Sequence, residues 1–208
     1  WEFVDPAGDG QAVMTGSQLE LSVAAGTSHD VWKTGNFAAR VMQAAADEDF
    51  EIEVKFESAV SERFQLQGLL VEEDAANFLR FDFYHDGTST RLFAASFSGG
   101  SPSVKKNVSI GSVGAPLYMR VSRQGDQWTQ RYSLDGVNWL TGAVFSRSLV
   151  VTAVGVFAGN AGGSSAPAHT AVVDYFFNTA SPIIPEDGTD LYTVTVNVTG
   201  SGSVNKNP

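Results

Sequence analysis

The stretch DFEIEVKF, residues 49–56, alternates hydrophobic and charged side chains with a period of two. In a β-strand successive side chains point to opposite faces, so Phe50, Ile52, Val54 and Phe56 would share one face. The charged residues between them would share the other face. The stretch therefore predicts a half-buried strand with one solvent-facing side, typical of an antiparallel sheet.

The same alternation recurs along most of the chain and predicts about a dozen short strands with almost no helix. Turns rich in Gly, Asp and Asn separate the runs, for example at residues 85–87 and 98–102. Residues 37–46, FAARVMQAAA, have good helix propensity, but the flanking pattern favours a strand. We expect an all-β, two-sheet antiparallel jelly-roll sandwich. The further alternating runs are residues 19–23, 64–71, 78–84, 91–97, 117–123, 128–133, 153–158 and 172–177.

Composition limits the classes of function. The 208 residues include 23 acidic and 13 basic side chains, a formal net charge of −10, so nucleic acid is not expected as a partner. The absence of cysteine excludes disulfides, thiolate zinc sites and a cysteine nucleophile. No apolar run approaches the roughly 20 residues of a membrane span, so membrane insertion is not expected.

Residues 132–139, YSLDGVNW, resemble the Asp-box of sialidases, which recurs once in each blade of a propeller. The Asp-box places one residue between Asp and Gly, whereas Asp135 and Gly136 are adjacent here. The motif also occurs once in the chain, without the internal repeat of a propeller. Asp-Gly between two strand-like runs is a strong hairpin signal, so the stretch predicts a turn between strands.

Several segments together resemble concanavalin A-like lectin/glucanase modules of secreted bacterial proteins. These modules include a bacterial domain of unknown function related to C-terminal sandwich domains of β-xylosidases and to fructan-binding modules. The resemblance covers roughly residues 1–180 and implies a concanavalin A-like sandwich that binds carbohydrate or accompanies carbohydrate-active enzymes. The matching segments are HDVW from His29, DFEIEVKFES from Asp49, FQLQGLLVEEDAANFLRFD from Phe64, RVSRQGDQWTQR with YSLDGVNW, VGVFAGN from Val154 and VDYFFN from Val173.

The composition changes near Ser181. Residues 181–190 are interpreted as a linker, because prolines interrupt the strand pattern. Residues 191–208 resemble the opening hairpin of a small bacterial surface repeat and are too few to bury a core of their own. We therefore expect residues 1–180 to be one module of a longer bacterial protein, secreted or at the cell surface, with other modules as its neighbours.

The strand predicted at residues 78–84 carries the first candidate site. Arg80, Asp82 and Tyr84 would share the face opposite Leu79, Phe81 and Phe83. Arg and Asp can each form paired hydrogen bonds with neighbouring sugar hydroxyls, and an aromatic ring can stack on a sugar ring. Gln65 and Gln67 on the next strand could add amide contacts from the same sheet. The alternative is a solvated face with an inconsequential Arg80–Asp82 ion pair.

A second candidate is a loop that could line one end of a sugar groove; its residues are His29, Asp30 and Trp32, with Asn36, Arg40 and Gln43 nearby. A neighbouring His–Asp pair is more often a local surface arrangement than a catalytic one. The sequence has no Gly-x-Ser-x-Gly elbow or Ser/His/Asp layout. The three histidines lack the spacing of zinc ligands.

A structural calcium site is a further expectation. Asp5 and Asp9 lie in a tight turn, and Asp174 lies on the last predicted strand. Sandwich folds often bring the two ends of the chain together, and calcium prefers oxygen ligands. The alternative is an ordinary Asp-Pro turn without an ion.

The case for an enzyme rests on Asp49, Glu51 and Glu53, which alternate on one strand. They loosely resemble the Glu-x-Asp-x-x-Glu catalytic strand of sandwich glucanases, but the third acid is missing and Lys55 shares the face. Lysine favours ionised carboxylates, whereas a general acid needs a raised pKa. We read this face as solvated and predict a non-catalytic carbohydrate-binding module that binds an oligo- or polysaccharide. The alternatives are a sandwich glycoside hydrolase and an adhesive spacer without a small ligand.

Overall fold

The computed structural model describes residues 1–184. The predicted surface-repeat segment, residues 191–208, and most of the predicted linker lie outside the described residues. Within the described part of the chain, no helix is long and apolar enough to cross a membrane.

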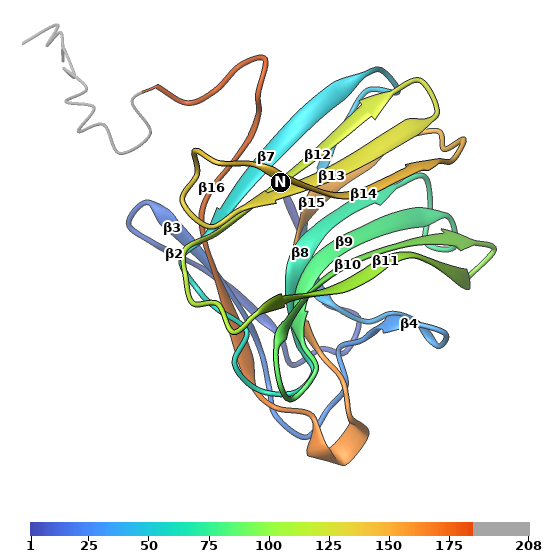
Figure 1. Cartoon of the computed structure of the whole chain (residues 1–208). Coiled ribbons are helices and arrows are strands. Elements are labelled where there is room, and N and C mark those ends of the chain that lie inside the picture. Colours follow the sequence, from blue (N-terminus) through green and yellow to red (C-terminus); the bar gives the residue numbers. More distant parts are fainter. Residues whose placement is uncertain (185–208) are drawn as a thin grey trace, which may run out of the picture.

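Two seven-stranded antiparallel sheets pack against each other as a sandwich (Figure 1), which confirms the predicted fold class. In spatial order, the first sheet contains β1 (Glu2–Val4), β6 (Ala39–Ala44), β15 (Ala153–Asn160), β8 (Gln65–Glu72), β9 (Phe78–His85), β10 (Thr90–Ser98) and β11 (Ser101–Gly111). The second contains β14 (Leu140–Ser146), β13 (Gln127–Ser133), β12 (Leu117–Gln124), β7 (Phe50–Phe56), β16 (His169–Asn178), β3 (Gln18–Val23) and β2 (Gln11–Thr15). A small hairpin, β4 (Val31–Trp32) and β5 (Gly35–Asn36), and a short 3₁₀ turn, η1 (Gly163–Ser165), complete the described elements.

The alternating runs of the sequence form strands as predicted, and residues 37–46 contain β6 rather than a helix. Strand β11 was not predicted, because its sequence SPSVKKNVSIG is polar and contains proline. It lies at the edge of the first sheet, where polar residues and proline are tolerated and discourage pairing with other chains.

The main core lies between the two sheets. Alternate side chains of both sheets meet there, as the period-two pattern requires. Its largest fully buried members include Phe56, Leu69, Phe81, Phe83 and Trp128. The indole nitrogen of Trp128 donates a hydrogen bond to the carbonyl of Arg147 (2.8 Å), so this polar atom is satisfied inside the core.

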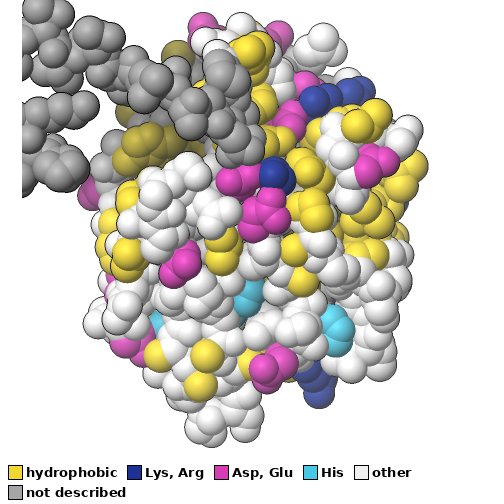
Figure 2. All heavy atoms as spheres, turned by 90° about the vertical axis from the view of Figure 1, so that its left-hand side faces the viewer, with side chains coloured by type: hydrophobic (Ala, Val, Ile, Leu, Met, Phe, Trp, Pro, Cys, Tyr) yellow, Lys and Arg dark blue, Asp and Glu magenta, His cyan; other side chains and the backbone are white. Residues whose placement is uncertain are grey.

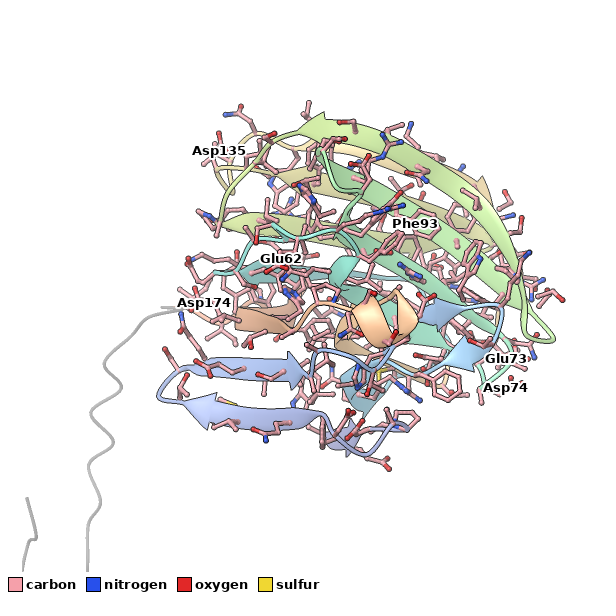
Figure 3. All side chains as sticks on the ribbon, turned by 90° about the horizontal axis from the view of Figure 1, so that it is seen from below. Glu62, Glu73, Asp74, Phe93, Asp135 and Asp174 are labelled. Carbon is pink, nitrogen blue, oxygen red and sulfur yellow. The ribbon has the colours of Figure 1, made fainter. Side chains whose placement is uncertain are left out.

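A second hydrophobic cluster lies on the outer face of the first sheet, beneath the β4–β5 hairpin. Figure 1 shows β4 on the side of β8–β11 that faces away from the second sheet, and Figure 3 shows this hairpin in front of the first sheet. The cluster therefore converts part of a sheet face into buried interior. Its members are Val31, Ala38, Met42, Leu66, Leu70, Phe78, Phe93, Ala95, Phe97 and Phe157.

Residues 134–139 connect β13 to β14 as a hairpin turn, so the stretch that resembles an Asp-box is not a propeller blade. Asp135 accepts hydrogen bonds from the backbone N–H groups of Val137 and Asn138, at 2.8 and 2.7 Å. Gly136 adopts a positive φ of 72°, which explains glycine at this position.

The charged side of β7 is only partly solvated, in contrast to the prediction of a solvated face. Glu53 is only 5% exposed, because Arg120 of β12 and Tyr175 of β16 cover it. Its carboxylate accepts hydrogen bonds from Arg120 Nε (2.6 Å) and from the Tyr175 hydroxyl (2.8 Å). The guanidinium of Arg120 lies in turn 4.0 Å from the centre of the Trp139 ring.

Candidate functional site

Arg80 and Asp82 of β9 lie on the outer face of the first sheet, opposite the side chains of β9 that enter the main core. Nε and Nη2 of Arg80 donate to the two oxygens of Asp82, at 2.8 and 3.0 Å. Nη1 donates to the carbonyl of Val31 in the overlying hairpin (2.5 Å). The guanidinium also lies 4.9 Å from the centre of the Phe93 ring.

This pair differs from both sequence-based readings. Arg80 is 4% exposed and Asp82 is fully buried, so neither a solvated ion pair nor an open row of sugar-binding groups is present. Nε and Nη2 of Arg80 already donate hydrogen bonds to Asp82 and are not available to a ligand. Arg80 and Asp82 therefore hold the β4–β5 hairpin against the sheet, and only the edge of Arg80 remains for a ligand.

A cavity of about 260 Å³ opens beside the hairpin. Asp30 and Trp32 line it from the predicted loop, and Arg80 and Tyr84 line it from β9. Trp32 meets the Phe93 ring edge to face at 5.9 Å, and Tyr84 does the same at 5.9 Å. The structure thus brings together four of the predicted sugar-binding residues; the remaining lining residues are Phe64, Leu66, Phe93, Val104, Asn107 and Ala161.

Two polar groups of this cavity keep hydrogen-bonding capacity. Oδ1 of Asp30 accepts from the backbone N–H of Val31 (2.8 Å), whereas Oδ2 makes no hydrogen bond with the described residues. Oδ1 of Asn107 accepts from Tyr84 Oη and Arg91 Nε, both at 3.1 Å, and Nδ2 makes no such bond with residues 1–184. The cavity therefore presents one acceptor and one donor beside its aromatic rings.

Burial changes the acidity of Asp30, the carboxyl group in the cavity lining. Burial raises the pKa of this carboxyl above its usual value, and the nearby Arg80 guanidinium only partly opposes the shift. Nη1 of Arg80 lies 3.7 Å from Oδ1 of Asp30. This carboxylate consequently protonates more readily than a surface aspartate would.

Gln65 and Gln67 are not part of this face, which corrects the prediction. Gln67 lies opposite Phe83 in the β8–β9 pairing, so its side chain points between the sheets. Its amide exchanges hydrogen bonds with Ser58 and lies 3.1 Å from Nε2 of His169. Gln65 accepts from the backbone of residues 61 and 62 and donates to the carbonyl of Ala168. The side chains of both glutamines therefore form hydrogen bonds with interior groups and do not face a ligand on the outer side of the sheet.

Arg40 lies on the same outer face but outside the cavity. Its Nε is 3.3 Å from Oε1 of Glu72, and Nη1 donates to the carbonyl of Ala38 (3.3 Å). Asn36 donates to the same Glu72 carboxylate. Burial raises the pKa of Glu72 and lowers that of Arg40, although each charge opposes the shift of the other.

The predicted ligands of the metal site are divided by the fold. Asp174 accepts a hydrogen bond from Lys55 Nζ (2.6 Å), and Figure 3 shows it on the other side of the molecule from β4. Asp5 and Asp9 instead lie next to His29, and ligand atoms of these three residues all lie within 4.8 Å of one another. His29 was predicted in the sugar groove, but its ring points away from the cavity, toward Asp9.

A second cavity, of about 570 Å³, lies where β1, β2, β3 and β16 meet. Its lining is mostly apolar and includes Trp1, Phe3, Met14 and Phe176. Figure 2 views the side on which β2 and β3 lie in Figure 1 and shows hydrophobic side chains grouped at its surface. Ser17, Asp174 and Tyr175 supply the polar part of the lining of this second cavity.

Phe93 and Asn107 are the important lining residues that the sequence did not predict. Phe93 lies opposite Asp82 in the β9–β10 pairing, and Asn107 lies opposite Phe93 in the β10–β11 pairing. Once the register is known, the row Asp82–Phe93–Asn107 across three strands is evident. In the sequence the only signal was that Phe93 breaks the alternation of residues 91–97.

The sequence matches a protein-family model over most of its length. Residues 11–173 match the model described as Protein of unknown function (DUF1349). The chain belongs to the DUF1349 family. This assignment agrees with the resemblance to a bacterial domain of unknown function but adds no activity. No curated protein sequence matches this DUF1349 chain.

Solved structures from yeast, bacterial and phage proteins have folds similar to that of this DUF1349 chain. A functionally unknown protein from Saccharomyces cerevisiae is 13% identical, with a TM-score of 0.70 over 88% of this chain and 96% of that one. The GH43 protein BlXynB from Bacillus licheniformis is 16% identical, with a TM-score of 0.63 over 84% of this chain and 35% of that one. The CBM2 module of the Lactobacillus casei BL23 phage J-1 evolved Dit is 8% identical, with a TM-score of 0.56 over 80% of this chain and 78% of that one. This chain thus spans about a third of the GH43 protein, and at these identities the likeness concerns the fold.

Proposed function

We propose that this DUF1349 chain is a non-catalytic carbohydrate-binding module whose ligand enters the cavity beside the β4–β5 hairpin. The observation that carries the proposal is the joint presence there of Trp32 and Tyr84 with the polar groups Asp30 and Asn107. A sugar ring presents apolar C–H groups to aromatic side chains and hydroxyls to polar ones. The cavity offers both kinds of partner within one small space.

The polar groups suit neighbouring hydroxyls. Oδ2 of Asp30 accepts a hydrogen bond from one hydroxyl, and Nδ2 of Asn107 donates to another. Arg80 and Tyr84 hold these two side chains in position through the contacts at 3.7 Å and 3.1 Å described above. Little side-chain freedom is then lost on binding, which favours affinity for a small polar ligand.

The size of the cavity indicates how much of a glycan is bound. Its 260 Å³ lies just below the range of about 300 to 1,000 Å³ that is usual for small-molecule sites. We infer that one sugar unit, at a chain end or in a side branch, enters the cavity and that the rest of the glycan remains outside.

Two of the solved structures support this proposal because the fold occurs in them as one part of a larger protein. The matching part spans about a third of the GH43 protein BlXynB and about a third of a xylan beta-1,4-xylosidase from Bacillus halodurans C-125. A module of this size beside a catalytic domain would hold the enzyme on its polysaccharide. We extend the proposal to a secreted or cell-surface bacterial protein with further modules.

A glycan array with the 208-residue chain tests the proposal, using plant, algal, bacterial and fructan glycans. Trp32→Ala and Asp30→Asn should each weaken a specific hit by at least about tenfold, or about 1.4 kcal/mol. The matched controls are Trp139→Ala, on the outer face of the other sheet, and Asp126→Asn, at an exposed turn. Both controls should bind as the wild type does. Thermal unfolding of every variant separates lost binding from lost folding.

Three other outcomes of the glycan array would change the proposal. No hit on any glycan would contradict the proposal and favour the spacer reading. Loss of binding in Trp139→Ala, with Trp32→Ala unaffected, would move the site to the other sheet. Hydrolysed glycan would favour the hydrolase reading, although Glu53 is already engaged by Arg120 and Tyr175.

A further inference from the structure

A cluster of three potential metal ligands lies outside the proposed sugar cavity. It joins Asp5 and Asp9 of the loop between β1 and β2 to His29, which lies two residues before β4. His29 is fully buried, whereas the side chain of Asp9 is 38% exposed. One edge of the cluster is therefore held in the interior, and the other is open to solvent.

Asn160 of β15 fixes the protonation of the His29 ring. Its Nδ2 donates to the carbonyls of Ala24 (2.8 Å) and Pro167 (2.6 Å), so its Oδ1 must face His29. That oxygen accepts the backbone N–H of His29 (2.8 Å) and lies 3.0 Å from Nδ1. Nδ1 therefore carries a hydrogen and donates it. In the neutral ring the lone pair is then on Nε2.

Nε2 of His29 lies 2.5 Å from Oδ1 of Asp9. A lone pair and a carboxylate oxygen are both acceptors, so a positive centre between or beside them is required. A second proton on the imidazole would supply one positive charge. A metal ion would supply two and would use the arrangement commonly found at histidine ligands, with the remote ring nitrogen donating to an oxygen.

Asp5 decides between these possibilities. Its Oδ2 accepts the backbone N–H of Gly10 (2.8 Å), whereas its Oδ1 is buried without a hydrogen-bond partner. A Cβ at residue 10 would lie 3.2 Å from this oxygen, so glycine keeps the space beside it open. Within residues 1–184 no Lys or Arg forms an ion pair with Asp5 or Asp9. Two carboxylates thus face one imidazole, and a divalent ion balances both.

We propose that Asp5, Asp9 and His29 bind a divalent transition-metal ion, with zinc as the best fit. Calcium, expected from the sequence, is disfavoured because one of the three ligands is an imidazole nitrogen, and calcium takes oxygen ligands. Zinc binds nitrogen and carboxylate oxygen at about 2.0 to 2.2 Å. Because Nε2 of His29 and Oδ1 of Asp9 are 2.5 Å apart, the exposed Asp9 carboxylate would move outward by about an ångström to admit the ion.

The ion would link two segments that adjoin the sugar cavity. Asp5 and Asp9 belong to the N-terminal loop, and His29 is the residue before Asp30 of the cavity. Three protein ligands leave at least one position for water, which suits a site open on one side. The inference stands independently of carbohydrate binding, since its ligands and its test involve no sugar.

Isothermal titration of the chelator-treated 208-residue chain with Zn²⁺, Mn²⁺ and Ca²⁺ tests the proposal. We expect one Zn²⁺ per chain, weaker Mn²⁺ binding and no Ca²⁺ binding at the same concentrations. Asp9→Asn, at an exposed position, should fold normally and lower zinc affinity at least tenfold. His29→Gln should abolish binding. Asp126→Asn and His85→Gln, which alter an exposed aspartate and a partly exposed histidine elsewhere, should bind as the wild type does.

Nitrogen NMR of the histidine rings tests the proposal on the wild-type chain and does not depend on whether His29→Gln folds. Zinc should shift Nε2 of His29 and leave its Nδ1–H intact. Two ring N–H groups on His29 at pH 7 that zinc does not perturb would show a simple ion pair with Asp9 and overturn the proposal. Tighter binding of calcium than of zinc, or zinc binding that survives Asp9→Asn unchanged, would overturn it as well.

Discussion

Arg80 and Asp82 form a two-bond ion pair inside the protein, with N···O distances of 2.8 and 3.0 Å. Residues two apart on a strand share a face, so the pair itself follows from the sequence. Its burial follows from the β4–β5 hairpin, whose Val31 carbonyl accepts the remaining Nη1–H of Arg80. The pair therefore links the sheet to the hairpin that forms one wall of the proposed binding cavity.

Removing one partner of this pair should be costly. Arg80→Met leaves the Asp82 carboxylate buried without a partner, and we expect a loss of about 3–5 kcal/mol in the free energy of unfolding. The double variant Arg80→Met/Asp82→Leu should recover a large part of this loss, because no charge remains buried. Urea unfolding measures both. A single variant that costs less than about 1 kcal/mol would show that the ion pair is unimportant.

Gly68 permits the close approach of β8 and β9 under the cavity. A Cβ at this position would lie 2.0 Å from the Phe81 carbonyl and 2.6 Å from the Cα of Asp82. Because backbone atoms must move, Gly68→Ala should cost about 1–3 kcal/mol or more. Gly114→Ala is the matched control, since nothing lies within 4 Å of its added Cβ. Equal unfolding midpoints for the two variants would contradict this view of the sheet.

His169 should make stability depend on pH. It is 5% exposed, and burial lowers its pKa from 6.5 to about 4. Between these two values the unfolded chain binds a proton that the folded chain does not, so stability falls as the pH falls. The full effect is about 3 kcal/mol, since each pH unit is worth about 1.4 kcal/mol.

Urea unfolding of wild type and His169→Gln at pH values from 4 to 7 measures this contribution. In that window the free energy of unfolding of the wild type should fall by up to about 1.4 kcal/mol more per pH unit than that of His169→Gln. His85→Gln, which alters a surface histidine, should show the same pH dependence as the wild type. Parallel curves for wild type and His169→Gln would mean that His169 is accessible to protons in the folded state.

Sugar binding should weaken at mildly acidic pH. Asp30 accepts a hydroxyl hydrogen best as a carboxylate, and burial raises its pKa above that of an ordinary aspartate. Affinity for the glycan identified on the array should therefore begin to fall at a higher pH than for an exposed aspartate. Asp30→Asn should bind weakly and show no such fall, and Asp126→Asn should retain it. Titration calorimetry from pH 7 to 4 would refute this role if wild-type affinity stayed constant.

The alternation at residues 49–56, 78–84 and the similar runs predicted most strands of the sandwich and, for these two stretches, the side chains that enter its core. This success has a local cause, because the strand period places alternate side chains on opposite faces whatever lies nearby. The polar edge strand β11 was missed for the converse reason, since an edge strand needs no hydrophobic face of its own.

The candidate site was predicted only in part. Arg80, Asp82 and Tyr84 lie on the predicted face, and Asp30 and Trp32 reach it from their loop. The register between β8 and β9 placed Gln67 in the interior, where Ser58 and His169 satisfy its amide. Strand pairing joins residues far apart in the chain, and no local pattern reports it.

The sequence by itself determined which residues alternate, where the chain turns and which family it resembles, because these properties depend on near neighbours. Only the tertiary structure decided that a hairpin covers Arg80 and Asp82, that Phe93 and Asn107 complete the cavity, and that His29 joins Asp5 and Asp9. Each of these arrangements depends on contacts between distant segments. Their partners are chosen by the packing of the whole sandwich.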